Sequence, residues 1–450
     1  MTRLAPPAET EPAIEARSSG DRGAPAADRS RFTLLLVSHA LIDVFPILFV
    51  TLMLPLREGL NLTEWQVRFV YMATPIFSGA LQPIFARLTD KYDTRLCGPL
   101  GLIIGAVCVG SIGLAQNFWQ LAVLQVIGVI GVGMYHPITT ALAGQAGSGW
   151  NIRNGGGRAL AIAVFISGGM LGHAIGPVVG SWINDAYGMA HLVWLIPPSL
   201  LIAIWLHVAL RRTPHRHVHH AELRAGFDDA ESMRRWGVIG VLTLQNALRF
   251  TTNVGMFLLF NTWMESKIQD DPALAAKHVG YLISAMTLGM GVAVLFAGHL
   301  SRKGRELAPL FWLSMIGAVF VATLGLVGDA LVGDRTPTAV ALIPMYACAA
   351  LTSVGFFATF PIATSLAQRL QPGHTSLVTA LMMGVGWSFS ALHAPLGVLF
   401  FGGVDLNQAA SLPPERINNG FFGFAVLLVI AGVLTLCIPR RLVRDAASVQ

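Results

Sequence analysis

The chain has 450 residues, of which 54% are hydrophobic and only 12% are charged, and its mean hydropathy is +0.61. Soluble domains carry about twice that charged fraction, so the composition excludes an ordinary soluble domain. The net charge of +6 does not indicate nucleic-acid binding, because the basic residues lie in loops and tails. Apolar blocks that alternate with short polar segments are typical of a polytopic membrane protein.

The first 31 residues are rich in Pro, Ala and charges of both signs. A signal peptide would have an apolar stretch followed by a cleavage site, and this segment has neither. We therefore expect residues 1–31 to form a disordered tail.

Twelve apolar segments follow, and each is long enough to cross a bilayer as a helix. They lie at about 32–56, 64–86, 97–116, 118–143, 159–184, 189–210, 236–264, 278–300, 307–328, 338–367, 375–401 and 417–438. The predicted fold class is an all-α polytopic membrane protein with twelve transmembrane helices.

Basic residues concentrate in the short loops on one side of these segments. They are Arg87, Lys91, Arg95, Arg153, Arg158, Arg302, Lys303, Arg305 and Arg369. The loops on the other side carry mainly acids, among them Asp185, Asp270, Asp329 and Asp405. The positive-inside rule then predicts a multi-pass protein of the inner (cytoplasmic) membrane with both termini in the cytoplasm.

The longest polar interruption, residues 211–235, divides the segments into six and six. Residues 137–143 (PITTALA) close the fourth segment and residues 361–367 (PIATSLA) close the tenth, with five identical positions out of seven. Two six-helix halves in parallel repeat are a known transporter plan. We expect an N-terminal bundle over 32–210, a cytoplasmic linker over 211–235, a C-terminal bundle over 236–438 and a cytoplasmic tail over 439–450.

Asp43 lies in the middle of the first apolar segment, one helical turn after His39. Residues four apart share a helix face and can touch. A carboxylate at bilayer depth costs several kcal/mol unless it is paired, protonated or facing water, so such residues are functional hypotheses by default. The alternative is a structural role, in which Asp43 pairs with another charge or orients His39.

Arg249 lies near the middle of the seventh segment, which corresponds to the first segment in the repeat. Asp43 and Arg249 are therefore predicted to lie at comparable depths in the two halves. A guanidinium stays protonated and offers a fixed positive charge, either to an anionic group of a substrate or to Asp43. Competition between a proton and a substrate for one carboxylate is a simple physical basis for antiport.

Several stretches resemble the major facilitator superfamily, and specifically its fosmidomycin-resistance-like branch of drug:proton antiporters. Residues 86–95 (ARLTDKYDTR) are similar to the superfamily's loop between helices two and three, although Ala86 and Asp93 replace its glycines. Residues 172–180 (GHAIGPVVG) are similar to the fifth-helix pattern of proton antiporters. The branch is indicated by the opening from Ser38 to Asp43, by residues 134–137 (MYHP) and by residues 366–387. The loop after the eighth segment departs from the family pattern, because residues 298–305 lack its acidic residue.

The resemblance implies two pseudo-symmetric six-helix bundles in which helices one, four, seven and ten line a central cavity. It then implies that Asp43 and His39 couple proton movement and that Arg249 faces them across the site. The residues expected to bind substrate are Arg249, Gln245, Asn246, Asn253, Tyr135, His136 and Trp387. Packing or hydrogen bonding between helices is the alternative for most of these side chains.

Two groups of residues are expected to act in gating. Gly172, Gly176 and Gly180 have small-xxx-small spacing around Pro177, which lets helix backbones approach closely and slide. The resemblance implies that Asp90, with Arg95 and Arg158, forms a cytoplasmic charge network that latches one state.

We expect no metal and no cofactor. No pair among His136, His173 and His393 has the i,i+3 or i,i+4 spacing of a metal site on one helix. The histidines of the central linker, at positions 215–220, fit a polar flexible segment. No set of nucleophile, base and orienting residue can be assembled, so an enzyme is not expected.

The function predicted from the sequence is proton-coupled efflux of a small anionic or amphipathic compound by a monomer in the lipid bilayer, with antibiotic resistance as the family context. One alternative is an uptake symporter for an organic anion on the same fold. Another is a membrane sensor or scaffold that transports nothing.

Overall fold

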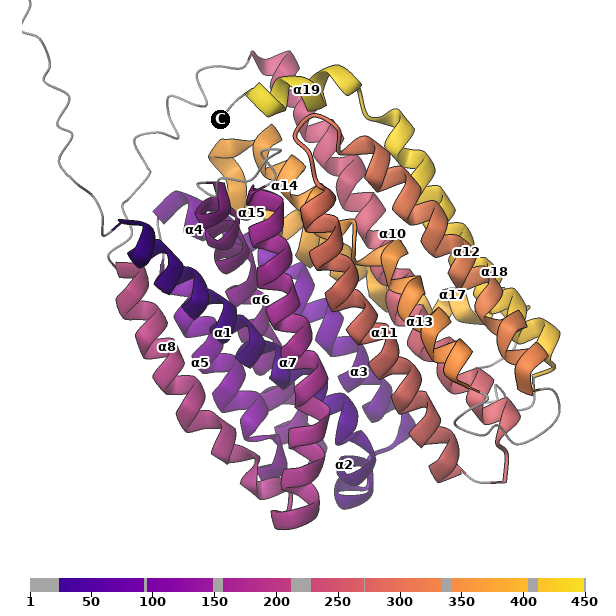
Figure 1. Cartoon of the computed structure of the whole chain (residues 1–450). Coiled ribbons are helices and arrows are strands. Elements are labelled where there is room, and N and C mark those ends of the chain that lie inside the picture. The colour runs from indigo at the N-terminus through magenta and orange to yellow at the C-terminus, as the bar shows by residue number, and fades with distance from the viewer. Residues whose placement is uncertain are drawn as a thin grey trace, which may run out of the picture.

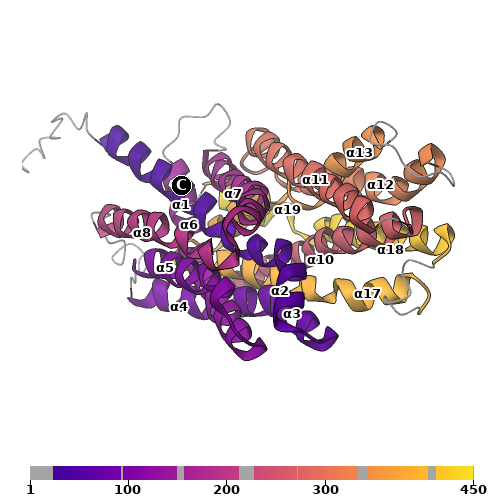
Figure 2. The same cartoon turned by 90° about the horizontal axis from the view of Figure 1, so that it is seen from below.

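The computed structural model describes residues 24–92, 95–148, 157–211, 228–270, 272–332, 342–403 and 412–448, and within these ranges it contains helices and no strand. The helices form two halves that lie side by side (Figures 1 and 2). The predicted fold class is therefore confirmed.

The N-terminal half contains the helices up to Arg211. They are α1 (Ala24–Thr51), α2 (Met53–Leu60), α3 (Glu64–Ala80), α4 (Gln82–Tyr92), α5 (Cys97–Gly110), η1 (Ile112–Leu114), α6 (Phe118–Ser148), α7 (Gly157–Tyr187), η2 (Met189–Leu195) and α8 (Ile196–Arg211).

The C-terminal half begins at α10. Its main helices are α10 (Asp229–Lys267), α11 (Pro272–Leu300), α12 (Leu307–Val332), α13 (Ile343–Phe356), α14 (Phe360–Leu370), α15 (Thr375–Ala380), α16 (Gly386–Ser388), α17 (His393–Phe400), α18 (Pro414–Val433) and α19 (Arg440–Ser448). A π-helical turn, η4 (Leu381–Val385), joins α15 to α16.

Eleven stretches of the described chain are long and apolar enough to span a membrane. The twelfth predicted span is α10, which has 39 residues but a lower mean hydropathy because it carries a run of polar side chains around Arg249. Those side chains are buried against the helices of the same half, so α10 takes its place in the bundle despite its polarity.

Local sequence accounts for several helix boundaries. Thr63 and Gln66 form a capping box at the start of α3, and the Asp228 carboxylate accepts a hydrogen bond from the backbone N–H of Glu231 at the start of α10 (2.6 Å). Pro137 lies inside an unbroken α6, whereas Pro361, its counterpart in the repeat, lies in the first turn of the separate helix α14. The two copies of the repeat are thus more similar to each other in sequence than in helix geometry.

The structure differs from the predicted tails. Helix α1 begins at Ala24, so residues 24–31 are helical, and α19 occupies most of the predicted C-terminal tail. The apolar face of α19 buries Val443 and Ala446 over α14, which explains why this short segment folds. Most of the predicted linker, residues 212–227, and residues 1–23 of the first tail lie outside the described residues.

The two halves touch along one part of their length. We call the side of the bundle that holds α19 and the start of α1 the terminal side (Figure 1). Helix α7 packs on α11 and α14, and α3, α4 and α6 pack on the segment from α15 to α16. Near the terminal side Gly298 lies against Leu160 and Ala163, and toward the middle the Ser167 hydroxyl contacts the Gly291 carbonyl (3.3 Å). The contacts described here therefore join the halves from the terminal side to the middle of the spans.

Candidate functional site

Three histidines from three helices converge on Asp43. Its Oδ2 lies 3.2 Å from His39 Nε2 on α1 and 3.7 Å from His173 Nδ1 on α7, and its Oδ1 lies 3.1 Å from His136 Nε2 on α6. Asp43 is 4% exposed and His39 is 1% exposed. The His173 side chain is 27% exposed, so it is the most accessible member of the cluster. The predicted contact of His39 with Asp43 is present, and two further histidines join it.

The backbone fixes the orientation of two of these rings. His39 Nδ1 lies 2.6 Å from the Phe165 carbonyl, and His136 Nδ1 lies 2.7 Å from the Val132 carbonyl. A carbonyl oxygen only accepts hydrogen bonds, so each Nδ1 carries a hydrogen and each Nε2 faces Asp43. The His39 ring also stacks on the Phe165 ring at 3.9 Å between centroids.

This arrangement has a consequence for protons. If Asp43 were ionised and both rings neutral, two nitrogen lone pairs would point at a carboxylate in a buried site, which is unfavourable. One added proton between His136 Nε2 and Asp43 Oδ1 makes their 3.1 Å contact a charge-assisted hydrogen bond. It also makes the net charge of Asp43, His39 and His136 zero. The geometry of the cluster thus accommodates one shared proton between His136 and Asp43.

The same side chains have the spacing of a metal site. One ligand atom each from His39, Asp43 and His136 lie within 4.8 Å of one another, and both rings are oriented through their other nitrogen, as metal-ligating histidines are. Spacing along a single helix does not reveal ligands that converge from different helices, as these three do. The absence of a metal stays a prediction.

Tyr135 lies behind the cluster, fully buried. Its hydroxyl contacts the Ser38 hydroxyl at 2.6 Å and the Leu35 carbonyl at 3.3 Å, both on α1. In this structure Tyr135 supports α1 next to His39, whereas the sequence predicted a contact with substrate.

Arg249 has different partners from the predicted one. Its side chain is fully buried, and its Nη2 donates to the Ser314 hydroxyl (3.0 Å) and contacts the Leu310 carbonyl (3.4 Å), both on α12. Among the described residues Arg249 pairs with no carboxylate, Asp43 included. The reason is geometric, because the guanidinium points into its own half. It remains a buried positive charge at the centre of the C-terminal half.

The other predicted substrate residues of α10 also bond within their half. Gln245 Nε2 donates to the Thr435 hydroxyl (3.0 Å), Asn246 Nδ2 to the Met382 carbonyl (3.1 Å) and Asn253 Nδ2 to Met290 Sδ (3.4 Å). Trp387 is half-buried and lies edge-on to Phe250, so it is the most accessible of the predicted C-terminal ligands.

The predicted glycines of α7 join α1 to α7 inside the N-terminal half. A side chain at Gly172 would overlap the Ala40 carbonyl, one at Gly176 would lie 2.9 Å from the Val44 carbonyl, and one at Gly180 would meet the end of the Leu48 side chain. The close approach predicted from their spacing is present. The side chain of Pro177 lies outside the described part of the structure.

The predicted charge network has a different composition. The Arg95 guanidinium donates to the last carbonyls of α8, at Leu210 (3.0 Å) and Arg211 (2.9 Å), while Arg158 Nη1 contacts Gln368 Oε1 of the other half at 3.3 Å. The Asp90 side chain is not among those described. Sequence reasoning missed Gln368 and the buried ion pair between Glu306 and Arg369. Only the basic Arg369 was noted in the sequence, because partners on different helices, whether in one half or across the two, have no fixed spacing along the chain.

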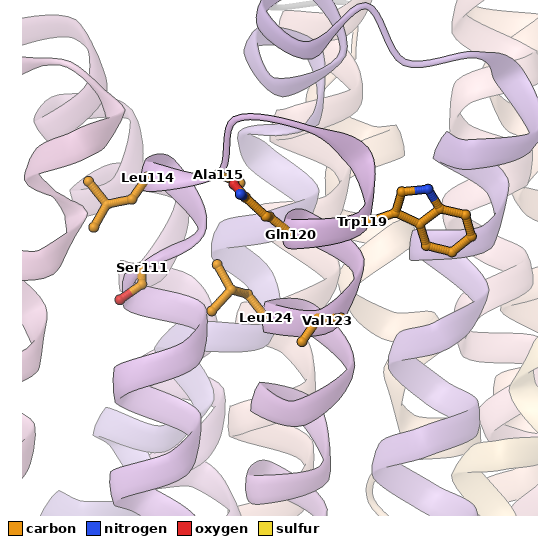
Figure 3. A pocket seen from close by; sticks show the side chains of 7 residues that line it. All are labelled: Ser111, Leu114, Ala115, Trp119, Gln120, Val123 and Leu124. Atoms are coloured by element: carbon orange, nitrogen blue, oxygen red, sulfur yellow. The ribbon is translucent and has the colours of Figure 1, made fainter.

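A groove elsewhere on the N-terminal half is not part of this site. It lies between the end of α5 and the start of α6 and is lined by Ser111, Leu114, Ala115, Trp119, Gln120, Val123 and Leu124 (Figure 3). None of these residues is titratable. The exposed Trp119 there is typical of a membrane–water interface.

Comparison with known proteins gives relatives along most of the chain. A model of the Major Facilitator Superfamily matches residues 35–395. The fosmidomycin resistance protein of Escherichia coli (strain K12) is 28% identical over 172 residues, which are 38% of this chain and 40% of that protein. The multidrug resistance protein MdtG of Proteus mirabilis is 29% identical over 32% of this chain and 34% of its own. These two matches thus span well under half of each relative.

Longer matches are more distant. The uncharacterized MFS-type transporter YfnC of Bacillus subtilis is 23% identical over 90% of this chain and 91% of its own. Among solved structures, the E. coli fucose:proton symporter FucP has a TM-score of 0.62 at 12% identity, covering 92% of this chain and 99% of its own. FucP in the outward conformation has a TM-score of 0.61 at 14% identity, with the same coverage. At these identities the structural likeness shows the fold alone.

Proposed function

The chain belongs to the Major Facilitator Superfamily of transporters, and we propose that it exports a small anionic or amphipathic compound in exchange for protons. Export as the direction of transport is supported by two relatives that are named for fosmidomycin and multidrug resistance, although they match only part of the chain. We also propose that it works as a monomer in the inner membrane.

The observation that carries the proton role is the convergence of His39, His136 and His173 on Asp43. A carboxylate among three imidazoles offers several neighbouring acceptors for one proton, and histidine is a common proton shuttle. Intramembrane carboxylates and histidines of this kind mark proton relays. Asp43 and His39 are the proposed coupling residues, and His136 joins them in place of the substrate contact predicted from the sequence.

The contacts between the halves support a route to this site. They join the halves from the terminal side to the middle of the spans. The Met170 Cβ on α7 lies 4.0 Å from the position of a side chain at Gly291 of α11, near the middle of the spans. His173 lies three residues further along α7, toward the side opposite the terminal side. We propose that a proton reaches Asp43 past His173 from the side opposite the terminal side. Separation of the halves at the terminal side then exposes the cluster there and releases the proton.

The orientation follows from the loop charges. Arg302, Lys303 and Arg305 lie at the terminal side, whereas Asp185 and Asp270 lie at the opposite side. By the positive-inside rule the terminal side is then cytoplasmic. Proton entry from outside the cell and release into the cytoplasm fits export driven by the proton gradient.

Arg249 bears on the class of substrate. Its charge has no carboxylate partner among the described residues, so its field in the low-dielectric interior favours an anion nearby. Asn246 holds one side of the guanidinium, and Trp387 offers an accessible aromatic edge in the same half. An anionic or amphipathic compound suits this combination better than a cation does.

Two structural features support the gating proposals. The glycines from 172 to 180 hold α1 against α7 within one half, so we propose that these two helices move together with the cluster between them, in place of the sliding predicted from the glycine spacing. At the terminal side Arg158 and Gln368 connect the halves, and the Glu306–Arg369 pair holds α14 to the start of α12. We propose that these contacts, with Arg95 and Asp90 nearby in sequence, latch the present state.

Transport by inside-out membrane vesicles tests the proposal. Vesicles with an acidic interior should accumulate a compound from a panel that includes fosmidomycin and amphipathic dyes, and a protonophore should stop the accumulation. Accumulation only by right-side-out vesicles in acidic medium would indicate the symporter instead. No gradient-driven flux of any compound would favour a sensor or scaffold, and loss of flux on chelation would indicate a metal at Asp43.

A further inference from the structure

Gly169 of α7 lies directly against the proposed proton site, which is the cluster of Asp43 with His39, His136 and His173. The neighbouring glycines face the α1 backbone or its aliphatic side chains, but Gly169 faces the functional groups. A Cβ atom built there would overlap Asp43 Oδ2 and would lie 2.7 Å from His39 Cε1 and 2.8 Å from His39 Nε2. Real Cβ atoms are not found that close to other heavy atoms.

The groups that a side chain would meet have little freedom to move. The Asp43 carboxylate is hydrogen-bonded to His136 on its other oxygen, at 3.1 Å. The His39 ring is bonded to the Phe165 carbonyl and stacked on the Phe165 ring. A methyl group at position 169 must therefore break one of these contacts, because the close-packed surroundings offer no free space.

We propose that Gly169 is a positioning residue for the proton site, because its missing side chain provides the space in which the Asp43 carboxylate meets His39. The steric part of this inference stands on the geometry alone. The functional part rests on the proposed proton coupling by Asp43.

Gly180 provides a matched control on the same helix. A Cβ atom there would also be crowded, but chiefly by Cδ2 of Leu48, the far end of a flexible side chain. Gly180→Ala is thus the same substitution at the same seam, three turns from the cluster, with a neighbour that can rotate away.

A double-mutant cycle on thermal stability tests the steric part, in purified full-length protein. We expect Gly169→Ala to lower Tm by several degrees in the natural background and by less with Asp43→Ala, which removes the atom nearest to the added methyl group, Asp43 Oδ2, and leaves the His39 ring as the remaining neighbour. Gly180→Ala should have the same effect in both backgrounds. If Gly169→Ala folds only together with Asp43→Ala, the proposal is supported as strongly. An equal loss in both backgrounds, or failure to fold in both, overturns it.

The pH profile of transport tests the functional part. With the compound found by the vesicle panel, Gly169→Ala should displace the pH of half-maximal transport, while Gly180→Ala should leave that pH where it is. A positive stability cycle with an unchanged pH profile would remove Gly169 from the proton site and would count against Asp43 as the coupling group. A transporter that shows no pH dependence at all would refute the proposed function without touching the steric result.

Discussion

Asp43 is stabilised at the centre of a hydrophobic bundle by the histidines around it. An unpaired carboxylate in this position would cost several kcal/mol. His136 contributes a hydrogen bond from another helix, and its ring is aimed by the Val132 carbonyl. The proton that completes this bond is the one that the account assigns to coupling.

Replacement of His136 tests this bond. His136→Gln removes the group that shares the proton with Asp43, and hydrogen bonds to charged groups contribute about 1.5–3 kcal/mol. We expect gradient-driven transport to fall by roughly 10-fold or more, as this energy implies. Transport by inside-out vesicles measures it, with His299→Gln as the control. His299 is exposed, and among the described residues its Nδ1 bonds to the Leu295 carbonyl of its own helix, so its loss should change little.

The site could be predicted from the sequence only where its residues share one helix. Asp43 and His39 are four apart, and their contact follows from helix geometry. His136 and His173 were visible as intramembrane histidines, but which of them reaches Asp43 depends on helix rotation and register. Arg249 shows the same limit, since the repeat predicts its depth but not the direction of its side chain.

At the scale of helices, the terminal side is held by a buried ion pair. Glu306 and Arg369 are 1% and 4% exposed, and they join the start of α12 to α14. Removal of one partner leaves the other charge buried without compensation, which typically costs about 3–5 kcal/mol.

Glu306→Gln should therefore lower the thermal stability of the purified protein markedly. The Arg441–Asp445 pair on α19 is the natural control, because its side chains are 93% and 50% exposed. Asp445→Asn should change Tm little, since exposed ion pairs contribute about 0–1 kcal/mol. Equal Tm shifts for the two variants would contradict the account of this contact.

Lys303, in the loop between α11 and α12, lies in the same region and has a shifted pKa. Burial, with the neighbouring cations Arg369 and Arg158, lowers the pKa of Lys303, and Glu306 opposes this only in part. The folded state thus disfavours the protonated amine, so Lys303 costs stability while it is charged. That cost fades as the pH rises through the lowered pKa toward the ordinary value for lysine.

Lys303→Gln should accordingly raise Tm at neutral pH, and the gain should shrink as the pH is raised. Thermal unfolding over a pH series measures this, with the exposed Arg302→Gln as the comparison. Arg158, on the other half, is one of the cations that lower the pKa of Lys303. The gain in Tm from Lys303→Gln should therefore be smaller in an Arg158→Ala background. A gain that is constant with pH would argue against the crowding of cations at this contact.

The partners of the charged residues at the terminal side could not be predicted from the family pattern. That pattern indicated Arg95 and Arg158 together, but Arg95 binds the end of α8 and Arg158 crosses to Gln368. Partners across two halves depend on how the bundles dock, and local spacing carries no information about that. The glycine spacing of α7, which is local, predicted close packing correctly.

At the scale of the molecule, the apolar blocks and the central polar segment were sufficient to predict two six-helix halves. Among the predicted spans in the described chain, only α10 is not apolar enough to be recognised by hydropathy, because it carries many polar side chains. Those side chains form their hydrogen bonds inside the bundle. The structure adds where the halves touch, which no sequence pattern encodes. Alternating access requires these contacts to open.

A disulfide between the halves tests that requirement. The Met170 Cβ lies 4.0 Å from the position of a Cβ at Gly291, close to the separation that disulfides favour. Oxidised Met170→Cys/Gly291→Cys, in a background without the native cysteines, should lose nearly all transport, and reduction should restore it. Each single-cysteine variant should stay active under oxidant. Undiminished transport by the cross-linked protein would mean that these helices do not separate.

The central claim is that Asp43 couples transport to protons. Purified protein in proteoliposomes, with an imposed pH gradient and a pH-sensitive dye, measures substrate flux and proton flux together. We predict that Asp43→Asn abolishes gradient-driven transport and the accompanying proton movement while the protein still inserts and folds. Full coupled transport by Asp43→Asn would contradict the account.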